Sequence, residues 1–220
     1  MERKEVAKAV SQGGVYLSHE LVSPVSSTLL ADVHFQDAEA SQLLTAALRE
    51  HFQAEQKGDK YLPVFFMVGA TSSTGDALGP FIGWFLKRKG FTGEYLGDLN
   101  EPVHATNIKE KVNEAWLKAM KRNKFPYIIA VDAAVGRPGR ITLNRGPLKP
   151  GAGMGKTLPQ VGSVHIMGGT AHFPFMIWFT GLDQTVAMAE VIADGLLAFY
   201  QEYESGQLRR TEAPPHTGSA

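Results

Sequence analysis

The sequence predicts an α/β fold with a mainly parallel mixed sheet that helices cover on both faces. Two observations support this prediction. Apolar runs of strand length, at 63–69 and 126–132, alternate with segments whose apolar residues recur at helical spacing. The runs are also unbroken by polar residues, as is typical of parallel strands, because such strands are buried on both faces.

Composition narrows the classes of function. The chain has 220 residues, 44% hydrophobic and 20% charged, which is enough to bury the core of one domain. Basic and acidic residues number 22 each, so no overall field favours nucleic acid or a membrane as partner. The chain has no cysteine, which excludes disulfides, thiolate metal ligands and a cysteine nucleophile. No secretory signal or membrane-spanning apolar stretch is visible, so we expect a cytoplasmic location.

We expect a single α/β domain over residues 37–205. The N-terminal arm, 1–36, carries few helix or strand signals and is expected to be partly mobile. The tail, 206–220, ends in Pro-Pro-His-Thr-Gly-Ser-Ala, a composition that favours disorder.

The first half of the domain alternates between helix and strand. A helix is predicted over 37–56, with Asp37 as its N-cap, because its apolar residues recur at helical spacing. The strand 63–69 follows, and then a helix from Asp76 to Lys89 that ends in Lys-Arg-Lys-Gly, as helix C-termini prefer. The apolar positions predicted to face inward on the first helix are Leu43, Leu44, Ala47, Leu48 and Phe52.

The second half repeats the alternation and then changes character. The segment 136–169 is rich in Gly and Pro, which indicates an irregular surface near a functional site. The predicted elements are a strand at 94–99, a helix at 108–122, the strand 126–132, short strands at 140–144 and 163–167, and a closing helix from Asp183.

Each of the two long apolar runs delivers an aspartate to its carboxyl end. The first leads into a loop of small residues that ends at Asp76, and the second ends at Asp132. Open α/β sheets collect functional groups at this edge, so the two loops would face each other if the strands are neighbours.

Asp76 has three interpretations. A phosphate-binding loop would end in Gly-Lys-Ser or Gly-Lys-Thr, whereas here Gly75 precedes Asp76, whose charge repels phosphate. Asp76 could instead cap the following helix, a contribution of about 1 kcal/mol. Its pairing with Asp132 favours a catalytic or metal-binding role, although Asp132 could itself be a turn residue before Gly136.

Several strings together resemble a known family. Between about residues 64 and 200, and in the same order, the chain is similar to the YyaC family, proposed spore proteases of endospore-forming bacteria. The strings are Ser73–Pro80 (STGDALGP), Glu101–Asn107 (EPVHATN), Ala130–Ala133 (AVDA), and Gly146–Gly153 (GPLKPGAG) with Leu158–Gly162 (LPQVG).

This resemblance implies a fold and a catalytic pair. The YyaC family resembles the germination protease that degrades small acid-soluble spore proteins and, more remotely, the hydrogenase-maturation endopeptidases. The relationship implies a three-layer phosphorylase/hydrolase-like fold. The two aspartates proposed as catalytic in the germination protease lie in Pro-Asp-Ala-Leu-Gly-Pro and Ile-Asp-Ala strings, which match Asp76 and Asp132. No cofactor is expected from the resemblance, which leaves a divalent metal open, because acidic residues and a histidine bind a metal in the maturation enzymes.

Further residues are candidates for binding a protein or peptide substrate at this cleft. The loop 150–155 matches a glycine-rich string of the germination protease and is expected to shape the cleft. His104 could be a structural histidine, and Lys149 could be only a solvated lysine. The substrate-binding candidates are Thr74, Gly75, His104, Lys149, Gly151 and Gly153, with His165 and His172 as further histidines near the cleft.

The resemblance thus implies a sporulation-associated peptidase in the cytoplasm of a sporulating cell or forespore, with a homo-oligomer left open. A metal-dependent maturation-type endopeptidase is one alternative. The other is an inactive sporulation binding protein, because Thr71 and Ser72 stand where members of the YyaC family usually carry an Asp-Arg pair.

Overall fold

The centre of the protein is one six-stranded mixed sheet. The computed structural model describes residues 29–55, 57–151 and 158–208, and its strand order is β1-β5-β6-β4-β2-β3. Strands β6, β4, β2 and β3 are parallel, and β5 is antiparallel to both β6 and β1. The predicted mainly parallel sheet is therefore confirmed. The strands are β1 (Leu29–His34), β2 (Tyr61–Met67), β3 (Glu94–Leu96), β4 (Phe125–Val135), β5 (Arg140–Arg145) and β6 (Val164–Ala171).

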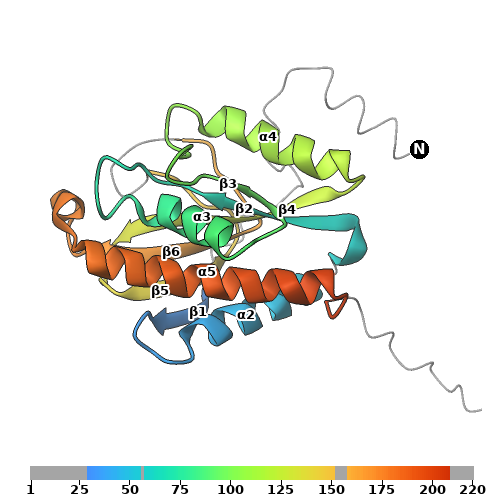
Figure 1. Cartoon of the computed structure of the whole chain (residues 1–220), viewed down its shortest axis with the longest axis horizontal. Helices are drawn as coiled ribbons and strands as arrows, with labels where there is room; N and C mark the ends of the chain where they lie inside the picture. Colours follow the sequence, from blue (N-terminus) through green and yellow to red (C-terminus); the bar gives the residue numbers. More distant parts are fainter. Residues whose placement is uncertain (1–28, 56, 152–157, 209–220) are drawn as a thin grey trace, which may run out of the picture.

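Helices cover both faces of this sheet and complete three layers. Figure 1 shows α4 on one side of the sheet, with α2 and α5 on the other, and α3 packs with this second group. Within the described part of the chain, no helix is long and apolar enough to cross a membrane. The helices are α2 (Ala40–Ala54), α3 (Leu78–Arg88), α4 (Ile108–Lys121) and α5 (Leu182–Glu204), with short 3₁₀ helices η1 (Gly58–Lys60) and η3 (Pro174–Phe179).

An apolar core lies on each face of the sheet, and the central strands contribute side chains to both cores. Successive side chains of a strand point to opposite faces. Phe65 and Met67 of β2 accordingly enter the core beneath α2, α3 and α5, whereas Val64 and Phe66 enter the core beneath α4. Burial on both faces explains the unbroken apolar run in the sequence.

The first helix differs from its prediction at its start. Helix α2 begins at Ala40, with Glu39 as the N-cap residue, so Asp37 is not its cap. The carboxylate of Asp37 accepts a hydrogen bond from the backbone N–H of His34 and closes the turn before the helix. Leu43 was predicted to face inward but is 47% exposed, because the buried stripe of α2 runs through Leu44, Leu48 and Phe52.

The sheet extends into the sequence predicted as an arm. Residues 29–34 form β1, an edge strand paired with β5. Asp32 anchors this strand, since its carboxylate accepts hydrogen bonds from the side chains of Arg137 and Arg140. The partly exposed edge position explains the weak strand signal. Residues 1–28 of the predicted arm and 209–220 of the predicted tail lie outside the described residues.

The start of α3 lies in direct contact with the end of β2. A Cβ atom built at Gly79 would lie 2.1 Å from the backbone oxygen of Val68. Only glycine permits this approach, and it fixes where the loop that carries Asp76 meets the sheet.

The substitution Gly79→Ala is therefore expected to destabilise the fold by about 1–3 kcal/mol through overpacking. This loss should appear although alanine has the higher intrinsic helix propensity, by about 1 kcal/mol. Denaturant unfolding measures the change, with Lys109→Ala on the exposed first turn of α4 as a control expected within about 0.5 kcal/mol of the wild type. A gain in stability from Gly79→Ala would show that α3 can move away from β2.

Candidate active site

Asp132 lies inside a strand near its carboxyl end. The sequence placed Asp132 at the end of its strand or in a turn, but β4 continues to Val135, so the turn interpretation is wrong. Ile128 and Ala130 of the same strand pack in the core beneath α4, and alternation places Asp132 on that face. The side chain is 7% exposed, and its Oδ1 accepts a hydrogen bond of 2.8 Å from the backbone N–H of Ala133.

Asp76 lies in the loop that joins β2 to α3. Helix α3 begins at Leu78 with Ala77 as its N-cap residue, so Asp76 does not hold the N-cap position that the sequence allowed. The loop closes on itself at Gly69. The N–H of Ala70 donates to the backbone oxygen of Asp76, and a Cβ atom at Gly69 would lie 2.1 Å from the same oxygen. This closure returns the half-buried Asp76 to the end of β2.

The sheet brings the two aspartates together, as predicted from their strands. β2 and β4 are parallel neighbours in which Met67 pairs with Val131, and the N–H of Val68 donates to the backbone oxygen of Val131 at 2.8 Å. The loop of Asp76 therefore leaves the sheet directly beside the strand that holds Asp132. Their carboxylates are close enough to interact electrostatically.

Burial raises the pKa of the Asp132 carboxyl group well above its usual range, and the negative charge of Asp76 raises it further. The hydrogen bond from the N–H of Ala133 acts in the opposite direction and does not offset these two effects. Asp132 therefore retains its proton at pH values where an ordinary aspartate is ionised. Two carboxyl groups with such different environments can divide the roles of general acid and general base.

Thr74 and Gly75 lie in the same loop as Asp76. Thr74 is half-buried, whereas Gly75 is buried beneath η3. The N–H of Gly75 donates to the backbone oxygen of Ile177, and a Cβ atom at Gly75 would lie 2.7 Å from the Ile177 side chain. Gly75 therefore fixes the loop against η3.

His104 lies at the same edge of the sheet. Its neighbour Val103 forms a parallel bridge with Val68, and the N–H of Gly69 donates to the backbone oxygen of Val103. The His104 Nδ1 lies 2.9 Å from the Thr106 hydroxyl within its own turn. The imidazole is half-buried and held on the side of β2 away from β4.

Residues 146–151 and 158–162, the described parts of the glycine-rich segment, lie on the Asp132 face of the sheet. Leu148 and Val161 bridge its two ends, and both pack in the core beneath α4. Lys149 is exposed next to this bridge, and Gly151 is half-buried with a φ of 69°. Gly153 lies outside the described residues.

His165 of β6 shares the face of Asp132. It pairs with Ala130, whereas Asp132 pairs with Met167, so the two side chains are diagonal neighbours on adjacent strands. Burial lowers the pKa of His165. Its Nδ1 donates to the backbone oxygen of Gly146 at 2.9 Å, which leaves Nε2 as an acceptor. Across residues 29–55, 57–151 and 158–208, no three His, Asp or Glu side chains gather as a metal site would require.

Sequence reasoning missed the segment that adjoins the Asp76 loop. The Ser73 hydroxyl and the Gly75 N–H both donate to the backbone oxygen of Ile177 in η3, at 3.0 and 3.1 Å. The signal for this segment is the uncharged run Phe-Pro-Phe-Met-Ile-Trp-Phe between the last predicted strand and the closing helix.

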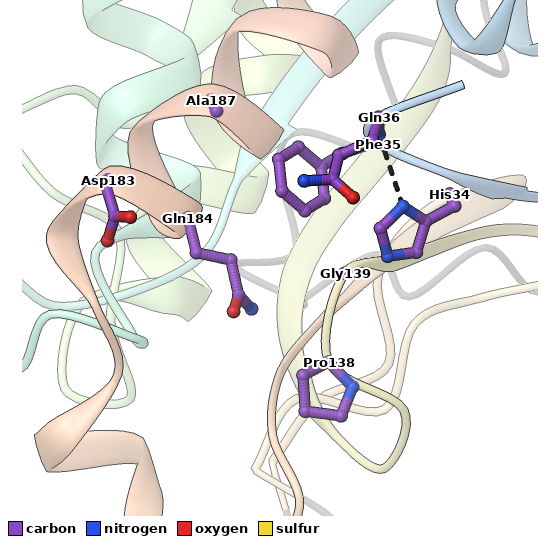
Figure 2. Close-up of a pocket in the computed structure, with 8 residues that line it drawn as sticks. All are labelled: His34, Phe35, Gln36, Pro138, Gly139, Asp183, Gln184 and Ala187. Carbon is purple, nitrogen blue, oxygen red and sulfur yellow. Dashed lines mark hydrogen bonds between the residues drawn. The ribbon is translucent and has the colours of Figure 1, made fainter.

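A separate pocket of about 460 Å³ opens at the same sheet edge, on the side of α5. Figure 2 shows it between the end of β1, the turn at Pro138 and Gly139, and the first turns of α5. Neither Asp76 nor Asp132 lines this pocket. His34 stands on its wall, with its Nδ1 accepting a hydrogen bond from the N–H of Gln36.

Comparison with known sequences assigns the chain to a family. A family described as "Protein of unknown function (DUF1256)" matches residues 32–195, which run from β1 into α5 and include both aspartates. The chain belongs to this family. It is also 38% identical over 194 residues to "Uncharacterized protein YyaC" of Bacillus subtilis (strain 168), covering 84% of this chain and 87% of the relative. The resemblance to the YyaC family is therefore confirmed.

The raised pKa of Asp132 makes a prediction for stability. The folded protein keeps a proton on Asp132 that the unfolded chain releases above about pH 4. The protonated Asp132 carboxyl group therefore makes its full contribution to the free energy of unfolding below about pH 4, and this contribution is lost as the pH rises. The loss has a slope of up to about 1.4 kcal/mol per pH unit until the pH reaches the folded pKa. Asp132→Asn removes it, so this variant should gain stability over the wild type from pH 4 upward. Urea unfolding at several pH values measures the difference. A constant difference across pH would contradict the raised pKa.

Proposed function

We propose that this protein is an endopeptidase in which Asp76 and Asp132 act as a paired base and acid on a protein substrate. The observation that carries this proposal is the buried Asp132 carboxyl group at the carboxyl edge of the sheet, whose pKa is raised by its burial and by the charge of Asp76. Such a pair is suited to hydrolysis of an unactivated amide, because the reaction needs a base for water and an acid for the carbonyl oxygen.

In the proposed reaction Asp76 accepts a proton from a water molecule as its oxygen attacks the peptide carbonyl carbon. Asp132 donates its proton to the carbonyl oxygen, so that a neutral tetrahedral intermediate forms. When the C–N bond breaks, the proton on Asp76 passes to the leaving nitrogen and Asp132 recovers its own proton. The products are a carboxylic acid and an amine, and both side chains return to their starting states.

The biological setting is proposed from the sequence resemblance. The strings around Asp76 and Asp132 are similar to those that hold the proposed catalytic aspartates of the germination protease. This similarity supports a peptidase that acts in the cytoplasm of a sporulating cell or forespore. The Asp76 carboxylate is only half-buried, which leaves the pair open to a polypeptide at this edge of the sheet.

The central experiment incubates the protein with lysate from sporulating cells and maps new peptide termini by mass spectrometry. Asp76→Asn and Asp132→Asn should each reduce the formation of these termini by at least about 100-fold, the usual contribution of a general acid or base. Asp183→Asn, in the first turn of α5 at the same sheet edge, is the matched control and should retain activity.

Three outcomes would overturn the proposal. Cleavage that persists in both variants would exclude the aspartate pair. Cleavage that a chelator abolishes and a divalent ion restores would establish the metal-dependent alternative. No new terminus in any lysate would favour a binding protein without chemistry.

A further inference from the structure

An exposed aromatic surface adjoins the loop of Asp76. In Figure 1 its segment is the orange turn that projects beyond the N-terminal end of α5. The exposed fractions are 55% for Trp178, 67% for Phe175 and 82% for Phe179. Large apolar side chains usually gain about 1.5–3 kcal/mol from burial, so this exposure is costly. The members of the aromatic surface are Phe173, Phe175, Met176, Trp178, Phe179 and Leu182.

The geometry of η3 directs these side chains outward. A 3₁₀ helix has three residues per turn, so Phe175 lies above Trp178 and Met176 above Phe179. The third face carries Ile177, which is half-buried and contacts the loop at Gly75. One apolar residue thus anchors the segment, and the larger aromatic residues around it face solvent. The rings of Phe173 and Phe175 stack with centroids 5.9 Å apart, which joins these two members of the surface.

The aromatic surface is fixed to the candidate active site. The Ile177 oxygen accepts hydrogen bonds from the Ser73 hydroxyl and from the N–H of Gly75, the residue before Asp76. The Thr180 hydroxyl donates to the backbone oxygen of Thr170 at the end of β6. A chain bound on the surface would therefore be held at a set position relative to Asp76.

Area and charge indicate what can occupy this surface. Its six side chains expose together roughly 700 Å², taking about 200 Å² for each large apolar side chain. This area exceeds the largest patch of a typical monomer, about 300–600 Å². It is below the roughly 800 Å² per partner of a standard protein interface, even if all of it were buried. No charged residue lies between His172 and Asp183. The area and lack of charge fit a short apolar stretch of polypeptide better than a second folded copy.

We propose that the aromatic surface binds an extended apolar segment of the polypeptide whose cleavage by Asp76 and Asp132 is proposed above, and so selects substrates with large apolar side chains beside the cleavage point. This inference rests on the proposed function. It adds the class of substrate, which the two carboxyl groups do not determine, because η3 is hydrogen-bonded to the loop that carries Asp76.

The test measures binding without cleavage. Asp132→Asn protein is titrated against a fluorescein-labelled dodecapeptide with alternating Leu, Phe and Ser, and against a matched peptide in which Gln replaces Leu and Phe. Fluorescence anisotropy should show at least tenfold tighter binding of the apolar peptide. Adding Trp178→Ser or Phe179→Ser should remove this preference. Adding Leu43→Ser, at an exposed leucine on α2, should leave it within twofold.

Equal binding of the two peptides, or a preference that survives both Trp178→Ser and Phe179→Ser, would overturn the inference. Phe179 is the most exposed of the set, so its substitution keeps the test valid if the Trp178 variant fails to fold. Sedimentation velocity provides the second arm. A wild-type dimer that Phe179→Ser converts to monomer would identify a second copy as the occupant and also overturn it. If the protein prefers the apolar peptide but the wild type cleaves no substrate, the proposed function is contradicted and the binding inference is not.

Discussion

The burial of the Asp132 carboxyl group beside the charge of Asp76 is the constraint on which the site depends. A buried carboxylate loses the hydration that stabilises its charge, and a second negative charge nearby adds repulsion. Asp132 meets both conditions and therefore keeps its proton. The burial of Asp132 beside Asp76 does not stabilise the folded state at neutral pH. The two apolar cores of the sheet must therefore offset the free energy that this burial costs.

The fold maintains this pairing through close backbone contacts. The parallel pairing of β2 and β4 places the two chain segments side by side at one edge. Gly69 lets the loop close onto the backbone of Asp76, and Gly79 lets α3 start against the end of β2. Side chains at these glycines would push Asp76 away from Asp132. Backbone packing at these two glycines therefore helps to set the position of the Asp76 carboxylate.

Much of this arrangement could be predicted from the sequence because it follows from local pattern. The unbroken apolar runs identified β2 and β4, and the rule for parallel strands placed Asp76 and Asp132 at one edge. The end of β4 was missed because Ala133, Ala134 and Val135 before a glycine also suit a turn. Strand β1 was missed because its stability comes from a distant partner, β5, and from the contacts of Asp32.

The aromatic surface could not be predicted for a different reason. A run such as Phe-Pro-Phe-Met-Ile-Trp-Phe normally indicates burial, and only the three-residue period of η3 around Ile177 turns the rings outward. In the proposed function the aspartate pair would supply the chemistry and the neighbouring η3 segment the selectivity. The family assignment covers the elements that build both features, since its match runs from residue 32 to residue 195.

The protonation state of Asp132 tests the account most directly. Carbon-13 NMR can follow the aspartate side-chain carboxyl groups through a pH titration, with Asp132→Asn identifying the signal. The account predicts that Asp132 stays protonated well above pH 4 and that its midpoint falls when Asp76 is replaced by Asn. A midpoint near the ordinary value of about 4, unchanged by Asp76→Asn, would contradict the account.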